Sequence, residues 1–527
     1  MTTRKKNSGL KLALRTSVVS GMTLVSRVLG LVRDVVFARY FGASLVMDAF
    51  LVAQRIPNML RRFFAEGAFS AGFIPVMARY REQHDHSEAR DFVDAVAGTF
   101  GIVLFLVTLV GVIASPLLVL IVAPGFVGDG GDFDLAALML RFTFPYLLFV
   151  SLTAFAGGIL NTYGRFGVPA FTPVILNVVL IAAAVWLSPR LEQPVMALAY
   201  AILVAGILQL LFQLPFLARM HAFPRPTWSP KHEGVRRAFR LMVPAIFGSS
   251  VAQINVLLGG IIASLLPVGS ISYLYFSDRL MEFPLGLFSI ALATVTLPTL
   301  SRLWASDDKT EFSQTLDWSM RIALLIVVPA AAGLILLAGP LITTLFFGGI
   351  FDEESVTMTM LALRAYAVGL IGFSFVKILA PAFFAREDTR TPVRIGLVAL
   401  GTNLVLSVAS AWYLSTTGFK GPHVGLAAAT SVAAILNAAL LYRGLRKDQV
   451  IRHSAGWPWL LARVGIANLA MCGVLYQLGR PLSWWLGVTV FDRIYWLTIS
   501  VTAGAASYFL ALLLLGMRPS QFRLKDS

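Results

Sequence analysis

The stretch AGTFGIVLFLVTLVGVIASPLLVLIV (residues 97–122) contains no Asp, Glu, Lys or Arg over 26 consecutive positions. A helix needs about 20 apolar residues to cross the hydrocarbon core of a bilayer, so this segment is long enough to span a membrane. Similar apolar runs, separated by short polar turns, recur along the chain. The sequence therefore predicts an all-α polytopic membrane protein.

The composition of the whole chain supports the same fold class. Of 527 residues, 57% are hydrophobic and only 13% are charged, whereas soluble proteins carry about 25% charged residues. The mean hydropathy is +0.78. These values exclude a soluble enzyme and a nucleic-acid-binding domain. A secreted disulfide scaffold is excluded too, because Cys472 is the only cysteine.

We predict fourteen transmembrane helices by taking about 20 residues per span. They lie near residues 13–40, 46–78, 92–122, 136–160, 168–188, 195–218, 241–266, 270–300, 315–346, 355–384, 393–415, 424–444, 457–478 and 491–516. The basic first residues resemble a signal peptide, but Arg15, Arg27 and Arg33 interrupt the apolar stretch that follows. We therefore expect a retained first helix.

Basic residues gather in alternate loops, which sets the expected topology. With an even number of spans both termini lie on one side, and the loops of that side hold most of the Lys and Arg, around 79–90, 219–240, 386–394 and 443–452. Membrane proteins keep Lys and Arg in cytoplasmic loops. Both termini are therefore predicted to be cytoplasmic, and the net charge of +16 follows from this topology.

An internal repeat is visible when the chain is shifted by 223 residues. The shift superposes Pro75 and Arg79 on Pro298 and Arg302, Asp129 on Asp352, Arg141 on Arg364, and Pro169 on Pro392. One offset serves four separate regions and carries the first helix onto the seventh. We therefore predict two parallel six-helix repeats around a central cavity, a known transporter arrangement, with two further C-terminal helices.

The predicted domain organisation follows from the repeat. It comprises an N-terminal six-helix lobe (1–220), a cytoplasmic linker with an interfacial helix (221–240), a C-terminal six-helix lobe (241–450), and two extra transmembrane helices with a cytoplasmic tail (451–527). In the linker we expect Val235, Ala238 and Phe239 to lie on lipid while the neighbouring arginines meet anionic headgroups.

The first two predicted helices carry charges at membrane depth, where each costs about 2.5 kcal/mol or more. They include Arg27, Arg33, Asp48, Arg55, Arg61, Arg62 and Glu66. Arg62 and Glu66 have i,i+4 spacing and can pair within one helix. Because arginines outnumber carboxylates, the group requires an anion. The planar guanidinium favours phosphate, and a diphosphate would match several arginines.

A second charged group lies in SDRLMEFPLG (277–286) of the second half. It contains Asp278, Arg279 and Glu282 within little more than one helical turn, and Arg279 can reach Glu282 at i,i+3. Two interpretations remain open. These residues can be a structural ion pair that holds helices together, or Arg279 can contact an anionic ligand.

Four segments of the chain resemble the MurJ (MviN) family of lipid II flippases of the bacterial inner membrane. They are SRVLGLVRDVVFARYFG (26–42), DAFLVAQRIPNMLRRFFAEGAFSAGFIPV (48–76), GILNTYGRFGVPAFTPVILN (158–177) and SDRLMEFPLG. The resemblance covers essentially the whole chain. The same superfamily holds the MATE exporters and the polysaccharide flippases.

The resemblance implies a transporter, not an enzyme, that acts in peptidoglycan biosynthesis, cell wall biogenesis and cell shape. Its substrate would be lipid II, the undecaprenyl-diphosphate-linked disaccharide-pentapeptide, moved from the cytoplasmic to the outer leaflet by alternating access. Family positions implicated in function match Arg27, Arg33, Asp48, Arg61, Arg62, Glu66, Arg279 and Glu282. Membrane lipids and cell-wall synthesis proteins are the other expected partners. The family's last two helices are thought to form a groove for the prenyl tail.

Other functions remain as alternatives. A flippase for another polyprenyl-diphosphate-linked oligosaccharide fits the same residues. A MATE-type exporter is disfavoured because excess arginine repels a cationic substrate, and a polyprenyl-diphosphate glycosyltransferase is disfavoured by the short loops. The acidic turns 129–134 and 352–354 could chelate a cation, although solvation explains them more simply. We expect no catalytic residue, metal or cofactor, and no Walker A loop is present; the coupling ion stays unknown.

Overall fold

The regular structure is helical throughout the described part of the chain. The computed structural model describes residues 2–63, 68–83, 86–128, 132–451 and 456–517. Eleven helical segments in these ranges are long and apolar enough to cross a membrane, which confirms the polytopic all-α fold class. Because side chains line lipid, many large apolar residues are exposed, such as Leu469 and Leu514.

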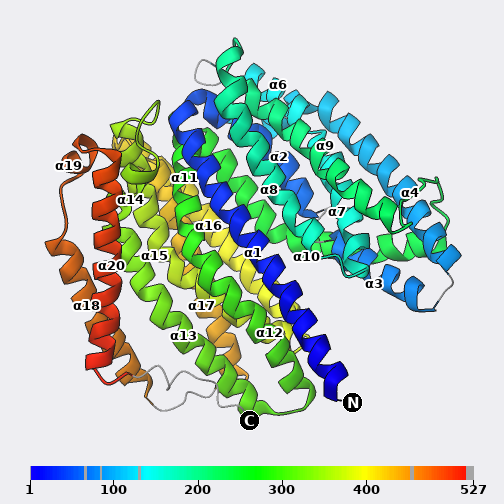
Figure 1. Ribbon diagram of the computed structural model, residues 1–527. Coiled ribbons are helices and arrows are strands. Elements are labelled where there is room, and N and C mark those ends of the chain that lie inside the picture. The colour runs from blue at the N-terminus through cyan, green and yellow to red at the C-terminus, as the bar shows by residue number, and fades with distance from the viewer. Residues whose placement is uncertain (1, 64–67, 84–85, 129–131, 452–455, 518–527) are drawn as a thin grey trace. The chain divides into compact units, whose positions relative to one another are not determined.

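The chain divides into two compact units, 1–268 and 269–527. The first unit contains α1 (Thr2–Phe41), α2 (Leu45–Arg61), α3 (Ala68–Gln83), α4 (His86–Ile113), α5 (Ser115–Val122), α6 (Phe133–Thr143), α7 (Tyr146–Thr162), α8 (Gly167–Ala182), α9 (Met196–Arg219) and α10 (Glu233–Ser264). The second unit contains α11 (Ser270–Pro284), α12 (Ile290–Ala305), α13 (Lys309–Leu336), α14 (Ala338–Leu345), α15 (Glu353–Phe384), α16 (Arg390–Thr416), α17 (His423–Lys447), α18 (Trp457–Gln477), α19 (Leu482–Gly487) and α20 (Val490–Leu514). Figure 1 labels most of these helices.

Several predicted spans are interrupted where proline removes a backbone donor. The predicted span 92–122 breaks at Ala114, just before Pro116, so that α4 and α5 are separate helices. The span 136–160 breaks at Pro145, between α6 and α7. After Pro284, a π-helical turn at Leu285–Ser289 connects α11 to α12. Such turns distort a helix without ending the crossing.

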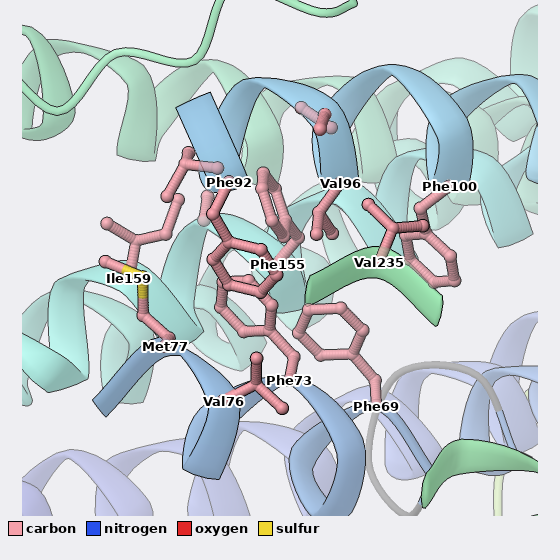
Figure 2. Packing of buried hydrophobic residues seen from close by; sticks show 14 of the residues in the cluster. Phe69, Phe73, Val76, Met77, Phe92, Val96, Phe100, Phe155, Ile159 and Val235 are labelled. Atoms are coloured by element: carbon pink, nitrogen blue, oxygen red, sulfur yellow. The ribbon is translucent and has the colours of Figure 1, made fainter. Parts of the chain in front are cut away.

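The core of the first unit is a stack of phenylalanine rings between α3, α4 and α7 (Figure 2). The rings of Phe69 and Phe73 have centroids 4.8 Å apart, and Phe73 lies 5.7 Å from Phe92 at an interplanar angle of 14°. Phe155 packs against the same rings from α7. Aromatic pairs at these separations add about 0.5–1.5 kcal/mol each beyond area burial.

The N-terminal turns of α10 complete this core. Val235 and Ala238 are 1% and 3% exposed, and Phe239 packs beside the cluster. The prediction that these side chains lie on lipid is therefore wrong: Val235 and Ala238 are buried, and Val235 and Phe239 pack in the cluster that holds Phe92 and Phe100 of α4. Residues 233–240 are the start of one continuous helix that ends at Ser264, so the structure shows no separate interfacial helix there. The domain borders proposed from the repeat stay a prediction.

The segment before α10 is hydrogen-bonded along α4. The Arg225 amide donates to the Asp94 carboxylate at 2.6 Å, and the Thr227 amide donates to the Asp94 carbonyl at 3.0 Å. The backbone of Thr227 lies so close to Gly98 that a Cβ there would collide with it. Glycine at position 98 is what permits this approach.

Acidic turn residues of the second unit cap helices. The Asp352 carboxylate accepts the Ser355 amide at 2.8 Å at the start of α15, and Asp308 accepts the Glu311 amide at the start of α13. The pKa of Asp388 before α16 is lowered because the hydroxyl and amide of Thr391 donate to its carboxylate. Capping of this kind satisfies helix amides that otherwise lack partners, and it gives Asp352 a role that needs no cation.

Helices α18 and α20 are hydrogen-bonded to α13 in the second unit. Trp457 donates its indole N–H to Asp317 at 2.6 Å, and Arg321 donates to the same carboxylate at 2.9 Å. Arg321 also lies 5.3 Å from the centroid of the Trp457 ring. Deeper along α13, the Tyr508 hydroxyl of α20 donates to the Leu325 carbonyl at 2.8 Å.

Gly98→Ala should destabilise the first unit, because its methyl group collides with the Thr227 backbone. Overpacking of this kind costs about 1–3 kcal/mol, and we expect a lower thermal midpoint of the purified protein in detergent. Gly101→Ala is the matched control, since a Cβ at Gly101 on the same helix has open space. Equal midpoints for the two variants would show that the segment over α4 shifts freely.

Candidate functional site

Arg33 and Asp34 of α1 form a hydrogen-bonded cluster with Asn177 of α8, which links the two helices. Arg33 donates to Asp34 Oδ1 through Nε at 3.0 Å and through Nη2 at 2.8 Å, and its Nη1 donates to Asn177 Oδ1 at 3.1 Å. Its guanidinium also lies 5.6 Å from the Phe37 ring centroid. Asn177 in turn donates to the Ser26 carbonyl at 3.1 Å. Arg33 is thus held by charge and hydrogen bonds from both helices.

Arg27 differs from Arg33 in its surroundings. Arg27 is exposed on α1, whereas the Arg33 side chain is 11% exposed and the Asp34 side chain 3%. A buried cation requires an internal partner, and Asp34 supplies it. Arg27 is exposed, so its guanidinium can donate to a ligand.

Sequence reasoning missed Asp34 and Asn177, although both carry a signal. Asn177 is a polar residue inside the apolar segment 168–188, where an amide at membrane depth requires a partner. Asp34 adjoins Arg33, but neighbouring residues on a helix do not normally face each other. The pairing depends on the long arginine side chain folding back, which spacing rules do not predict.

The predicted site residues of α2 lie at opposite ends of that helix. Asp48 is 3% exposed in the first turn, which follows the N-cap Ser44. Arg61, in the last turn, donates through Nε to Asn58 Oδ1 at 3.0 Å. Arg62 is exposed just beyond it. Glu66, and with it the predicted Arg62–Glu66 pair, lies outside the described residues.

The side chain of Arg55, on the same helix, packs against α10 at Gly260. A Cβ at Gly260 would collide with the Arg55 guanidinium, so the arginine side chain occupies the space that any larger residue would fill. After Arg33, Arg55 is therefore the second arginine of the predicted cationic group that the structure places between helices of the first unit.

The charged group of α11 forms the expected ion pair. Arg279 Nη1 lies 3.1 Å from Glu282 Oε2, and the two side chains are 39% and 48% exposed. Arg279 also lies 5.0 Å from the centroid of the Tyr275 ring. An exposed pair of this kind contributes about 0–1 kcal/mol, so it is easily exchanged for another partner. Asp278 beside it is half-buried.

The described residues offer arginines and isolated carboxylates, and no cluster of three His, Cys, Asp or Glu side chains in these ranges is arranged to hold a metal ion. Chemically the site residues can bind and release an anion, because guanidinium groups are permanently charged donors. Each arginine with a carboxylate partner can in principle exchange that partner for a phosphate oxygen.

Comparisons with known proteins agree on one family. The family described as "Lipid II flippase MurJ" matches residues 37–495. A probable lipid II flippase MurJ of Vibrio cholerae serotype O1 is 46% identical over 508 residues, which are 95% of each chain. The lipid II flippase MurJ of Burkholderia cenocepacia is 42% identical over 96% of this chain and 98% of its own.

Solved structures give the same result. A structure of lipid II flippase MurJ in an inward closed conformation matches with a TM-score of 0.77 at 26% identity, over 94% of this chain and 97% of that one. An inward-facing multidrug MATE transporter matches with a TM-score of 0.65 at 17% identity, over 82% of this chain and 98% of its own. At that identity the MATE likeness concerns the fold alone.

Proposed function

The chain belongs to the MurJ family, and on that premise we propose that it is a flippase for lipid II in the bacterial inner membrane. It moves this undecaprenyl-diphosphate-linked disaccharide-pentapeptide from the cytoplasmic to the outer leaflet by alternating access. The observation that carries the proposal is the 46% identity to a probable lipid II flippase along 95% of both chains. The excess of arginine at membrane depth supports it, because the substrate carries a diphosphate.

The proposed binding residues are Arg27, Arg33, Arg61 and Arg62 in the first unit and Arg279 in the second. Their guanidinium groups replace the water that the diphosphate loses on entering the membrane. Asp48, Glu66 and Glu282, together with Asp34 beside Arg33, are the carboxylates that compete with the ligand for these arginines. Release then occurs when the arginines return to carboxylate partners of their own chain.

The Arg33–Asp34 and Arg279–Glu282 ion pairs support this exchange. Each of these arginines is within ion-pair distance of a carboxylate, which a diphosphate oxygen would have to displace. The two pairs differ in burial, and the buried one is harder to open, because an isolated charge there is costly. We infer that Arg279 exchanges partners easily and that Arg33 does so only when α1 and α8 move.

We also propose fourteen spans in two parallel six-helix repeats with both termini cytoplasmic. Helix boundaries support the repeat: α13 begins 223 positions after α4 and ends 223 positions after it, and the same holds for α14 and α5. The three further spans are α1, the α2–α3 segment and α10. All three carry charged residues, among them Arg27, Arg55 and Arg240.

Loss of single arginines should abolish transport. We expect Arg27→Ala, Arg33→Ala and Arg61→Ala to stop the flipping of labelled lipid II in cells depleted of the native protein, while the variants stay in the membrane. Lysine should restore only part of the activity, because it keeps the charge but loses the bidentate fork.

Arg90→Ala, in an exposed position on α4, is the control for these arginine variants and should behave like the native chain. An unrelated polyprenyl-diphosphate oligosaccharide tested beside lipid II identifies the substrate. Full activity with lysine at all three positions would refute the bidentate geometry, and transport of the unrelated lipid alone would refute the assignment to lipid II.

A charge swap tests whether Arg279 binds ligand or only pairs with Glu282. Arg279→Glu combined with Glu282→Arg keeps the exposed ion pair, so folding should be unchanged. We expect flipping to be lost, because the guanidinium moves by almost one helical turn. A double variant that flips lipid II at the native rate would make the pair purely structural.

Labelling of single cysteines tests the topology. In a Cys472→Ala background, Lys231→Cys and Glu354→Cys occupy exposed positions in a predicted cytoplasmic and a predicted external segment. An impermeant thiol reagent should label intact cells only at position 354. Equal labelling at both positions would be incompatible with fourteen spans and cytoplasmic termini.

A further inference from the structure

The connection between α18 and α20 lies at one end of two apolar helices. Both helices are long and apolar enough to span a membrane, and Figure 1 shows them joined through α19. Residues 478–489, between the two helices, must therefore lie close to a membrane–water interface. Trp and Tyr are enriched at that depth because their rings are apolar and their N–H and O–H groups are polar.

Aromatic residues are concentrated in and beside this connection. They are Tyr476, Trp484, Trp485, Phe491, Tyr495 and Trp496. Phe491 and Tyr476 are 86% and 82% exposed. Rings left this open by the protein are stabilised by an apolar or interfacial environment, so the bilayer interface is the medium that fits them.

The connection is held in one conformation by buried contacts. Arg493, which is 6% exposed, donates to the Trp485 carbonyl at 2.7 Å and to the Leu486 carbonyl at 2.9 Å. These two bonds satisfy carbonyl groups at the end of α19. Trp485 is itself buried. The Thr489 hydroxyl caps α20 by accepting the Asp492 amide and donates to the Asp492 carboxylate at 2.7 Å.

Arg480 occupies a corner formed by two tryptophan rings. Its guanidinium carbon lies 4.2 Å from the centroid of Trp484 and 4.0 Å from that of Trp496, and the rings stand at 88° to each other. Cation–π attraction holds the side chain there. In the described part of the chain Arg480 is in no ion pair, and the residue is partly exposed, so its guanidinium can reach a further partner.

We propose that this corner binds the phosphate of a membrane phospholipid and fixes the depth of the α18–α20 hairpin in the bilayer. A guanidinium donates bidentately to phosphate oxygens. A bilayer presents phosphate at the depth where the tryptophan rings lie. The acyl chains of the same lipid would then lie along the apolar surface of α18 and α20. The ligand is a bulk phospholipid, distinct from the transported substrate.

The first experiment measures the thermal midpoint of the purified full chain in detergent with added dioleoylphosphatidylglycerol or with dioleoylglycerol, which has the same chains without phosphate. The thermal midpoint of the native chain should rise more with the phospholipid than with dioleoylglycerol. Arg480→Gln should lose most of this difference, with about tenfold weaker retention of the phospholipid in native mass spectrometry.

Lys420→Gln is the matched control, since Lys420 is an exposed lysine in the loop before α17; it should keep the native difference. If Arg480→Gln does not fold, Trp496→Leu serves instead, because it keeps the charge and removes one wall of the corner. An unchanged phospholipid effect in Arg480→Gln or Trp496→Leu, or an equal effect of the two lipids on the native chain, overturns the proposal. If lipid II, and not added phospholipid, displaced the lipid bound at the Arg480 corner, that result would also overturn the proposal.

The second experiment measures depth. Gly487→Cys and Gly465→Cys each have open space for a side chain and can carry a fluorophore in a Cys472→Ala background. Nitroxide on the lipid headgroup should quench the label at 487 more strongly than the label at 465. Nitroxide at the end of the acyl chain should quench the label at 465 more strongly than the label at 487. A label at 487 that headgroup nitroxide does not quench would place the connection outside the interface and refute the anchor.

Discussion

Charged groups inside apolar helices need partners from the protein itself, and the helix contacts of each unit follow from that need. Arg33 finds Asp34 and Asn177, which joins α1 to α8. Asp317 finds Arg321 and Trp457, which joins α13 to α18. In hydrocarbon no water replaces a missing partner. A polar residue in these spans therefore determines which helices lie together as well as what they bind.

The same need explains how a cationic site can both bind and release a diphosphate. An arginine that binds only ligand would be left uncompensated after release, at a cost of several kcal/mol if buried. An arginine with its own carboxylate exchanges one anion for another, so the difference between the two states stays small. Exposure sets how readily this occurs: the Arg279 side chain is 39% exposed and that of Arg33 11%.

The sequence predicted the helices better than their contacts. Apolar length located the eleven described segments that are long enough to cross a membrane, because apolar length is a local pattern. The breaks near Pro116 and Pro145 are local signals too, and span counting overlooked them. That Arg279 can reach Glu282 was visible in the sequence, because i,i+3 spacing is also local, and the structure forms this pair. Asn177 with Arg33 and Trp457 with Asp317 join residues more than a hundred positions apart. Such pairs depend on which helices pack together, and periodicity does not determine that.

Both protein contacts and bilayer contacts determine the position of the α18–α20 hairpin. At its first residue, α18 is fixed to α13 by the Trp457–Asp317 hydrogen bond. Its 21 residues span about 30 Å at 1.5 Å per residue, which equals the hydrocarbon thickness of a typical bilayer. The far end therefore falls at the opposite interface, where Arg480 and its tryptophan rings lie. The hairpin also contacts protein along its length, because Tyr508 donates to the Leu325 carbonyl of α13 and Arg493 lies 4.8 Å from the centroid of the Phe347 ring. These protein contacts determine which helices lie beside the hairpin, and the headgroup contact of Arg480 determines its depth in the bilayer.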